Sequence, residues 1–344
     1  MKKIFITSGA VMLMGCILFL TALMMSGCSF VNIFSDKLNT NSYDITEAFS
    51  DISVNADTAD ITFIPSSDGS CRVVCYENKR LRHTPSVKDG TLLITFSDET
   101  KWHDHIMTFD NSTIIVYLPL DKYGKLTVNS DTSDVKIPND LSFDSIDISL
   151  STGDVTLNAS ADAEIKITAS TGKIMLGDLS ASSLDIKTST GDITISGVTL
   201  SGDLTTSVST GDISISDLTC QNLSSGGNTG DIDLNNVTAF GDLTVNRSSG
   251  KTNMTSAYAA KFSIETDTGD VTLDRCDADE VKIKTSTGDV ASTFMTEKII
   301  YTDTSTGDID IERSTTGGIC DITTSTGDIT VRFVGKADDG GADS

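Results

Sequence analysis

Hydrophobic and polar residues alternate in short segments that recur along the second two-thirds of the chain. Each pair of segments flanks a tripeptide of the type Thr-Gly-Asp, and successive glycines are 19 or 20 residues apart. A period this regular is typical of a repeat architecture. The ten glycines are Gly153, Gly172, Gly191, Gly211, Gly230, Gly250, Gly269, Gly288, Gly307 and Gly327.

Each repeat predicts two β-strands that bury one face. Positions seven and five before the glycine are mostly apolar, as are positions two and four after it, and polar residues lie between them. This alternation has the period of a strand. A further apolar position, seven residues after the glycine, predicts one more interior side chain at a corner. It is occupied by Leu179, Val198, Leu218, Val237, Cys276 and Met295.

Two degenerate copies of the repeat extend the pattern toward the N-terminus. Ser133 and Ala59 take the place of the glycine, with apolar positions on both sides as in the other copies. Between the two copies, residues 64–125 are less regular. We therefore expect N-terminal β coils with an irregular insert over residues 49–125, and a regular array over residues 126–334. The apolar runs of the irregular stretch are 71–75, 92–96 and 114–118.

Two architectures fit this local pattern: a meander of hairpins, or a coil that turns at each glycine. A meander would need roughly twenty antiparallel strands, whereas open sheets rarely exceed about ten. Residues 139–344 contain no proline, as expected for strands whose amides all donate to a neighbour. The pattern favours an all-β fold, a single-chain β-solenoid with coils of 19–20 residues. At about 4.8 Å per layer, ten coils give a rod of roughly 48 Å, and we expect its open edge at the last coil, Ile322–Phe333.

The N-terminus predicts a membrane anchor over residues 1–30. Residues 4–25 carry no charge and follow Lys2 and Lys3, and as a helix they would span about 33 Å, enough for a bilayer core. The positive-inside rule places the N-terminus in the cytoplasm and the rest of the chain outside the cell membrane. Alternatively, the sequence around Cys28 is a lipoprotein box whose cysteine is acylated after cleavage. Both alternatives put the same domain on the outer face of a membrane.

Two further segments are expected to lie outside the solenoid. Residues 31–48 are interpreted as a linker. Residues 335–344 have no apolar run and are expected to be a disordered tail.

Composition excludes nucleic acid as a partner. The chain has 49 acidic and 25 basic residues, for a formal charge of −24, and such a chain repels phosphate backbones. Much of the acidic excess is periodic, because the residue after the glycine is usually aspartate. Stacked coils would place these residues in one column: Asp154, Asp192, Asp212, Asp231, Asp270, Asp289, Asp308 and Asp328, interrupted by Lys173 and Lys251.

The aspartate column has two interpretations. Carboxylates one layer apart repel by about 0.9 kcal/mol even in water, so another interaction must offset this. In the favoured interpretation each carboxylate accepts a hydrogen bond from a turn amide and faces solvent, and the protein has no cofactor. In the other, the column is a row of weak Ca²⁺ sites. The residues of that row would be Asp192, Asp212, Asp231, Asp270, Asp289, Asp308 and Asp328.

Other candidate chemistry is weaker. His103 and His105 would share one face of a strand and could ligate a metal with Asp98 or Glu99. Residues 246–252 are similar to the end of a phosphate-binding loop but lack its first glycine. The cysteines form no recognisable framework and are interpreted mainly as buried thiols. No histidine lies in the regular coils to act as a base, which argues against catalysis.

The chain resembles the bacterial putative-adhesin family of β-strand repeat proteins, a domain of unknown function. The resemblance rests on an N-terminal apolar helix, the Asp-Ile-Ser-Val start at residues 51–54, the Ala59–Phe63 segment, the Ile115–Pro119 strand and the Ser-Thr-Gly-Asp-Ile turns. It implies a bacterial envelope protein without established catalytic residues. No site residue can be transferred from it.

The favoured function is a non-catalytic extracytoplasmic scaffold that binds cell-surface or envelope components along its rod. Its partner would be an envelope polymer or a membrane protein, and the pattern does not define an oligomeric state. The alternative from another class is an accessory sensor or regulator of envelope stress, acting with another membrane protein. A β-helix enzyme acting on polysaccharides is a minor alternative.

Overall fold

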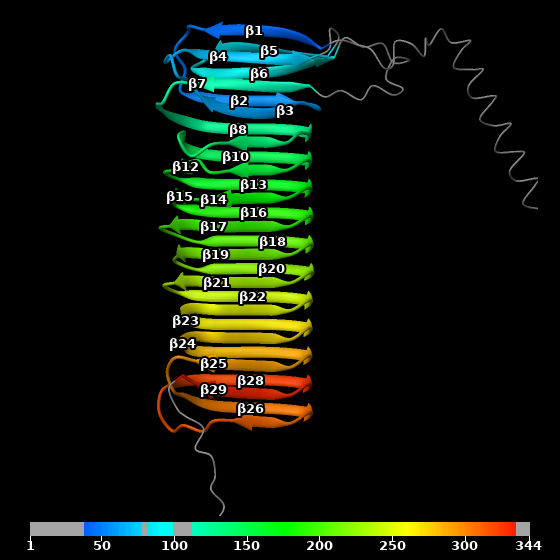
Figure 1. Cartoon of the computed structure of the whole chain (residues 1–344), viewed down its shortest axis with the longest axis vertical. Helices are drawn as coiled ribbons and strands as arrows, with labels where there is room; N and C mark the ends of the chain where they lie inside the picture. The colour runs from blue at the N-terminus through cyan, green and yellow to red at the C-terminus, as the bar shows by residue number, and fades with distance from the viewer. Residues whose placement is uncertain (1–37, 78–80, 99–111, 335–344) are drawn as a thin grey trace, which may run out of the picture.

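The computed structural model describes residues 38–77, 81–98 and 112–334, which form one rod of stacked β coils (Figure 1). The predicted membrane helix at 4–25, Cys28 and the predicted tail at 335–344 lie outside these residues. Within the described ranges, no helix is long and apolar enough to cross a membrane.

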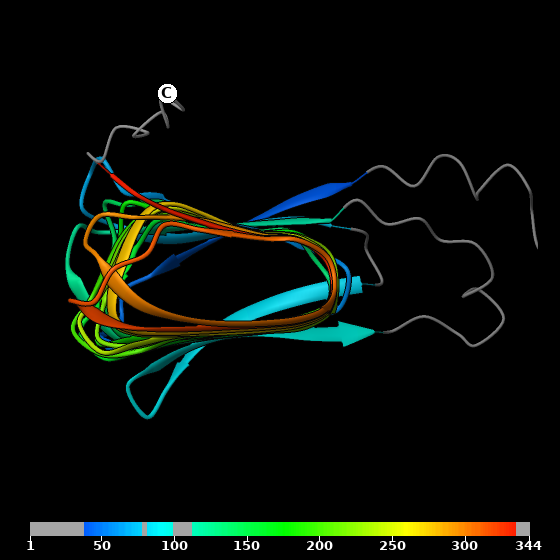
Figure 2. The same cartoon turned by 90° about the horizontal axis from the view of Figure 1, so that it is seen from below.

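Each coil has two long sides and one short side, as Figure 2 shows along the rod axis. In one coil, β16 (Ser183–Thr190) runs to the glycine corner and β17 (Ile193–Leu200) returns from it. All pairing between regular coils is parallel, and outside one shift between β24 and β25 it is in register: Ile186 lies between Ile167 and Thr206 of the adjacent coils. The predicted β-solenoid is therefore confirmed, and the meander is excluded.

Most strands of the regular coils alternate between the two long sides, whereas β23 (Thr252–Thr268) and β24 (Val271–Thr287) each run along both. The bounds of the regular strands are β8 (Lys122–Thr132), β9 (Val135–Ile137), β10 (Ser142–Thr152), β11 (Val155–Leu157), β12 (Ser160–Ala161), β13 (Glu164–Thr171), β14 (Ile174–Gly177), β15 (Ser180–Ala181), β16, β17, β18 (Leu204–Thr210), β19 (Ile213–Cys220), β20 (Leu223–Thr229), β21 (Ile232–Ala239), β22 (Asp242–Ser249), β23, β24 and β25 (Val290–Phe294).

Stacking at the glycine corner leaves no room for a side chain. Gly288 has a φ of 151°, and a Cβ atom there would lie 2.1 Å from the carbonyl oxygen of Gly269 in the adjacent coil. The amide of Gly269 in turn donates to the carbonyl of Thr287 at 2.8 Å. Glycine is therefore required because the corner backbones of successive coils touch.

The second corner depends on a residue with positive φ, six positions after the glycine. Asp217 and Asn236 have φ values of 52° and 54°, in the left-handed region that Asp and Asn tolerate better than most residues. This conformation turns the chain so that positions four and seven after the glycine both face the interior. The buried side chains at position seven include Leu179, Val198, Leu218, Val237 and Cys276.

The prediction of an interior Met295 is wrong. Met295 is 41% exposed, whereas Phe294 is completely buried. The register between β24 and β25 shifts after Leu273, which brings Phe294 opposite Cys276. The larger aromatic side chain thus fills the corner in this coil.

The coil interior consists mainly of Ile, Leu and Val, and in several coils a buried threonine lies three positions before the glycine. The Thr285 hydroxyl donates to the carbonyl of Gly269 at 3.4 Å, and Thr324 donates to Gly288 at 3.3 Å. These bonds engage corner carbonyls from inside the coil. The threonines therefore belong to the core even though they are polar.

The cysteines of the described residues are buried and free, as the sequence predicted. Burial raises the pKa of Cys71 and Cys276 to about 11, and that of Cys75, Cys220 and Cys320 to about 12. They pack as small apolar side chains.

At the N-terminal end the spatial order of the coils departs from chain order. β2 pairs with β6 on one side and β8 on the other, so the insert builds an outer coil over the first one. Antiparallel strands β1, β4 and β5 finish this end. The strands are β1 (Asn39–Ile45), β2 (Asp51–Ala56), β3 (Asp60–Pro65), β4 (Cys71–Glu77), β5 (Leu81–Lys88), β6 (Thr91–Asp98) and β7 (Thr113–Leu118).

Strand β1 corrects the interpretation of residues 31–48 as a linker. Residues 39–45 pair with β4 along their whole length, Asn39 opposite Glu77 and Ile45 opposite Cys71. The strand has no repeat pattern of its own. Its structure comes from a partner that lies some thirty residues further along the chain.

The C-terminal end also exchanges the order of two coils. β28 (Gly318–Thr326) pairs with β24 on one side and with β26 (Lys298–Thr306) on the other. β29 (Ile329–Phe333) likewise lies between β25 and β27 (Ile309–Ile311). The expected open edge at Ile322–Phe333 is therefore wrong: this coil is internal, and β26 with β27 forms the end of the rod (Figure 1).

The exchange requires the connection from β25 to β26 to pass the connection from β27 to β28. A Cβ atom on Gly317, whose φ is 98°, would lie 1.7 Å from the carbonyl oxygen of Glu297. Ser314 and Thr316 donate hydroxyl hydrogen bonds to the Glu297 carboxylate at 2.6 and 2.8 Å. Glycine is needed here because the ascending and descending chains touch.

Candidate functional site: an acidic column and a polar groove

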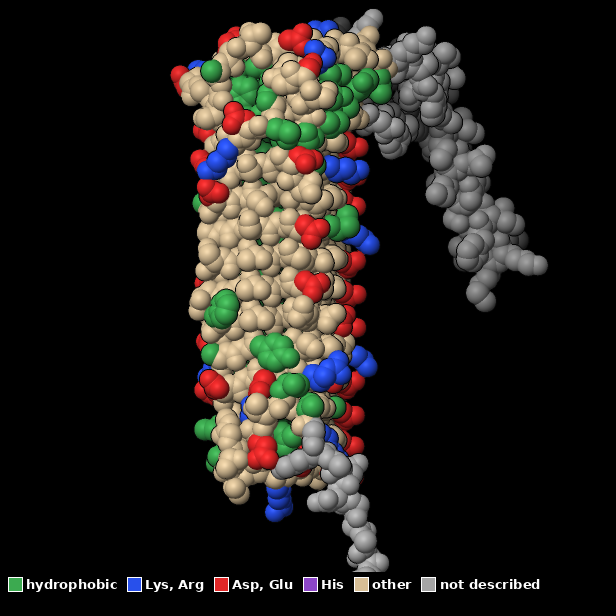
Figure 3. Space-filling model, turned by 60° about the vertical axis from the view of Figure 1, so that its left-hand side comes forward, with side chains coloured by type: hydrophobic (Ala, Val, Ile, Leu, Met, Phe, Trp, Pro, Cys, Tyr) green, Lys and Arg blue, Asp and Glu red, His purple; other side chains and the backbone are tan. Residues whose placement is uncertain are grey.

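The predicted aspartate column is assembled along one edge of the rod (Figure 3). Its order follows the coils in space, so Asp328 stands between Asp289 and Asp308. Asp60 and Asp134 also belong to it, because the amide of Asp134 donates to Asp60 Oδ1 at 2.9 Å. Both follow the degenerate glycine positions Ala59 and Ser133, which was the signal for them in the sequence.

Every carboxylate in the ladder before the terminal Asp308 accepts a hydrogen bond from the next coil rather than from its own turn. The amide of Asp231 donates to Asp212 Oδ1 at 2.8 Å, and the amide of Asp154 donates to Asp134 Oδ1 at 2.9 Å. Hydrogen bonds to a charged acceptor are stronger than those between neutral groups. They offset the repulsion between stacked carboxylates.

The two lysines in the column neutralise their neighbours. Lys173 Nζ lies 3.5 Å from Asp192 Oδ2, and Lys251 Nζ lies 3.1 Å from Asp270 Oδ2. The hydrogen bond from Lys251, together with one from the Asp289 amide, lowers the pKa of Asp270 below its ordinary value of 3.8. The column is therefore divided into short acidic runs.

No group of three or more His, Cys, Asp or Glu side chains within the described ranges is arranged to hold a metal ion. The calcium row thus remains a prediction without a preformed cage. His103 and His105, the other candidate ligands, lie outside the described residues.

One histidine of the insert is buried in the N-terminal end. His83 Nδ1 lies 3.0 Å from Glu77 Oε2, and the His83 amide donates to the same oxygen at 2.7 Å. Burial raises the pKa of Glu77, but hydrogen bonds from His83 and Asn41 outweigh it and leave the pKa below its ordinary value of 4.5. This pair joins β4 to β5.

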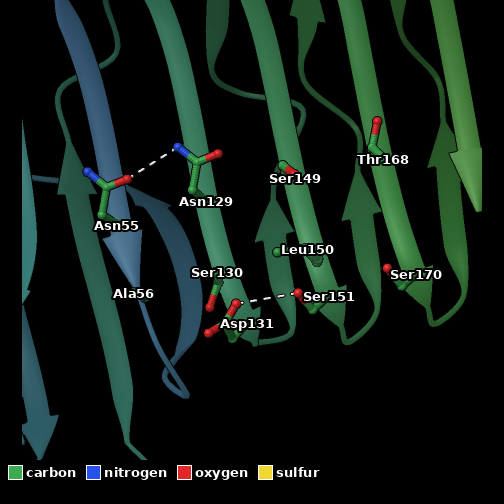
Figure 4. A pocket seen from close by; sticks show the side chains of 10 residues that line it. All are labelled: Asn55, Ala56, Asn129, Ser130, Asp131, Ser149, Leu150, Ser151, Thr168 and Ser170. Atoms are coloured by element: carbon green, nitrogen blue, oxygen red, sulfur yellow. Dashed lines mark hydrogen bonds between the residues drawn. The ribbon is translucent and has the colours of Figure 1, made fainter.

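A shallow polar groove of about 400 Å³ crosses the first coils on one long side (Figure 4). Asn129 Nδ2 donates to Asn55 Oδ1 at 3.2 Å, and the Ser151 hydroxyl donates to Asp131 Oδ1 at 3.4 Å. Hydroxyl, amide and carboxylate groups thus face solvent at layer spacing. The lining residues are Asn55, Ala56, Asn129, Ser130, Asp131, Ser149, Leu150, Ser151, Thr168 and Ser170.

Sequence reasoning missed this groove, although its signal is in the repeat. Its exposed residues occupy positions four and two before the glycine, such as Ser149 and Ser151 before Gly153. Short side chains fill these positions in the first coils. Longer ones, such as Lys187 and Glu265, take the position four before the glycine in later coils.

The sequence profile of the Toastrack DUF4097 family matches residues 49–225 and 213–342. The chain belongs to the Toastrack DUF4097 family. The two matched ranges cover the coils of the rod and both of its exchanged ends. The predicted resemblance to an adhesin-like family of unknown function is thereby confirmed.

Solved structures similar to this Toastrack chain are named mainly as adhesins. A putative adhesin from Parabacteroides distasonis is 17% identical, covering 75% of this chain and 98% of its own, with a TM-score of 0.44. A putative adhesin from Bacteroides fragilis is 16% identical, with coverages of 76% and 97% and a TM-score of 0.40. A putative lipid binding protein from Parabacteroides distasonis is 17% identical, with coverages of 74% and 96% and a TM-score of 0.40. No curated protein matches the chain.

The segment of the Toastrack rod that is similar to a phosphate-binding loop is an ordinary corner with one unusual interior residue. Arg247 is only 4% exposed, and it points inward opposite Gly227. A Cβ atom on Gly227 would lie 2.1 Å from Arg247 Nη1, so the glycine makes room for the guanidinium. Burial lowers the pKa of Arg247, while Asp212 and Asp231 oppose this effect.

Proposed function

We propose that this Toastrack protein is a membrane-anchored, extracytoplasmic and non-catalytic scaffold that binds envelope components along its rod. The carrying observation is the groove at Asn129 and Ser151, where hydrogen-bonding side chains of successive coils form one continuous polar surface. An extended polymer rich in hydroxyl and amide groups matches such a surface, because it can bond to several coils at once. The acidic column would add contacts to an anionic wall through bridging cations.

Binding is tested by co-sedimentation of the full-length protein, purified in detergent, with insoluble cell-wall polymer from the source bacterium. The doubly substituted variant Ser151→Leu/Ser170→Leu fills the groove and removes two hydroxyls. We expect it to lose at least tenfold in affinity. The matched control is Ser286→Leu/Ser325→Leu, at the same coil position far from the groove, and it should bind as the unmodified protein does.

Equal binding by the two variants would refute the groove as the contact surface. No sedimentation of the unmodified protein would refute polymer binding. Release of soluble sugar from the polymer would favour the enzyme interpretation instead.

The location is tested with a single exposed cysteine. Ser209→Cys lies on an exposed corner, whereas the native thiols of the described coils are buried. A membrane-impermeant maleimide should label this variant in intact cells, above the background of the unmodified chain. Labelling only after lysis would contradict an extracytoplasmic rod.

Replacement of the predicted anchor distinguishes the scaffold interpretation from the sensor interpretation. A chain in which residues 4–25 are replaced by an unrelated membrane helix should keep polymer binding. The sensor would be favoured if the unmodified protein did not bind the polymer and the replacement of its helix abolished an envelope-stress response.

A further inference from the structure

The two ends of the rod are protected differently. The N-terminal end has two edge strands among the described residues, since β5 pairs only with β6 and β1 only with β4. Of these, β5 carries Pro85 between Arg82 and Lys88. Proline and cations on an edge strand prevent pairing with another chain. At the C-terminal end, β26 and β27 pair on one side only within the described part of the chain, with β28 and β29. They contain no proline, and the Nζ atom of Lys298 turns inward to Asp277.

Interior side chains are open to solvent at this end. Ile309 is 46% exposed, whereas Ile329, at the same position of the adjacent coil, is completely buried. Ile300 and Ile311, at the other interior positions of this coil, are only partly buried. The terminal coil thus presents both an unpaired main-chain edge and apolar side chains that a further layer would cover.

The chain's own tail cannot supply that layer. Residues 335–344 contain no Ile, Leu, Val, Met or aromatic residue. Strand β1 lies at the opposite end of the rod (Figure 1). A strand from another molecule suits this edge better than residues 335–344 do.

Charge favours a second copy in a two-fold arrangement. Asp308 ends the acidic column at the glycine corner, and Arg313 lies just beyond β27 on the opposite side of the coil. If β26 paired antiparallel with its own copy, each Asp308 would approach the Arg313 of the other copy. The other two-fold arrangement, with β26 opposite β27 of the copy, would instead bring the two acidic columns together.

We propose that the C-terminal end of the rod binds a second copy of this chain, end to end, through antiparallel pairing of β26. The contact is isologous, so it closes at two copies. The dimer would place the two N-terminal ends, with their predicted anchors, at the far ends of a double-length rod.

The test is the molar mass of the full-length protein in detergent, measured by light scattering over a range of protein concentrations. We expect a dimer for the unmodified chain and at least a tenfold higher dissociation constant for Ile309→Lys. Met175→Lys places the same change on an exposed side of the rod and should leave the dimer intact. Dimers that persist in Ile309→Lys would overturn the proposal, because association would then occur elsewhere.

A charge exchange tests the arrangement itself. Asp308→Arg and Arg313→Asp should each weaken the dimer, and the double variant should restore it. A monomeric unmodified chain that instead captures a foreign strand would overturn the second copy as the occupant. Single variants without effect would overturn the antiparallel arrangement.

Discussion

The main-chain amide of Asp328 donates a hydrogen bond to Oδ1 of Asp289 at 2.8 Å, across 39 positions of sequence. In the regular coils the same bond spans 19 or 20 positions, as between Asp231 and Asp212. One whole coil is therefore skipped and placed at the end of the rod. The exchange changes which residues are exposed at the terminal surface.

Engineered disulfides should report this order. Ser286 and Ser325 lie between residue pairs of adjacent strands, Thr285 with Thr324 and Thr287 with Thr326. The variant Ser286→Cys/Ser325→Cys should form a disulfide under mild oxidation, because Cα atoms of adjacent strands are about 5 Å apart. Ser286→Cys/Ser305→Cys should not, since those residues are two layers apart. Mass spectrometry of tryptic peptides distinguishes the two outcomes. A disulfide in Ser286→Cys/Ser305→Cys but not in Ser286→Cys/Ser325→Cys would show that the coils stack in sequence order.

Replacing the glycine at the crossing should destabilise the rod. Gly317→Ala puts a Cβ atom against the Glu297 carbonyl in a conformation that costs about 1–3 kcal/mol even without a clash. Gly226→Ala is the control, because its nearest heavy atom would be 4.0 Å away. Denaturant unfolding should show a loss above about 3 kcal/mol for the first variant and under about 1 kcal/mol for the second. Equal losses would contradict the crossing.

The buried guanidinium should be a cost to stability. Arg247 Nε and Nη1 have no hydrogen-bond partner in the described part of the chain, and Nη2 reaches only the Asp231 carbonyl at 3.4 Å. Arg247→Met keeps the length of the side chain and removes the unsatisfied donors, each of which costs about 1–3 kcal/mol when buried. We expect a higher melting temperature. Lys166→Met, an exposed change of the same charge, should have little effect, and a lower melting temperature for Arg247→Met would show that the charge stabilises the column.

Calcium should leave the unfolding temperature unchanged. One oxygen of most column carboxylates is already occupied by an amide of the next coil, as at Asp289, and the described residues contain no preformed metal group. Differential scanning calorimetry with millimolar Ca²⁺, against the same ionic strength of Na⁺, checks this. A rise of several degrees specific to Ca²⁺ would establish the ion row.

The native thiols should be unreactive in the folded rod. Burial raises the pKa of Cys276 to about 11 and that of Cys320 to about 12, so almost no thiolate is present at pH 8. Iodoacetamide should modify the five cysteines of the described coils only after unfolding in guanidinium, as followed by mass spectrometry. Rapid modification of Cys320 in native buffer would mean that the C-terminal end opens.

Much of the coil could be predicted from the sequence because each repeat carries its own local rules. Alternation defines the buried faces, the glycine defines a corner where backbones touch, and the aspartate follows it by one position. The acidic column follows directly from the period, and the structure has it as expected. The hydroxyl groups of the groove recur with the same period. They line a groove only where the side chains of the neighbouring coils are also short.

The order of the coils could not be predicted, because every coil presents nearly the same pattern and pairs equally well with any other. The two possible orders of the last coils differ in which interior side chains become buried, and this difference is visible only in the three-dimensional structure. The terminal coil has Thr302 at the interior position where the internal coil has Ile322, which is completely buried. The internal coil also buries Phe333, at 5% exposure. Burying the more apolar coil between two others removes more apolar surface from water.

The sequence by itself thus determined the unit: a strand, a glycine corner, a second strand and an acidic edge, all set by contacts between neighbouring residues or identical positions one period apart. Only the tertiary structure decided which unit lies at each end, where Glu297 and Gly317 cross, and why Arg247 has room inside. Those outcomes depend on competition between equivalent partners. A repeat makes such partners locally indistinguishable, and only the packed rod separates them.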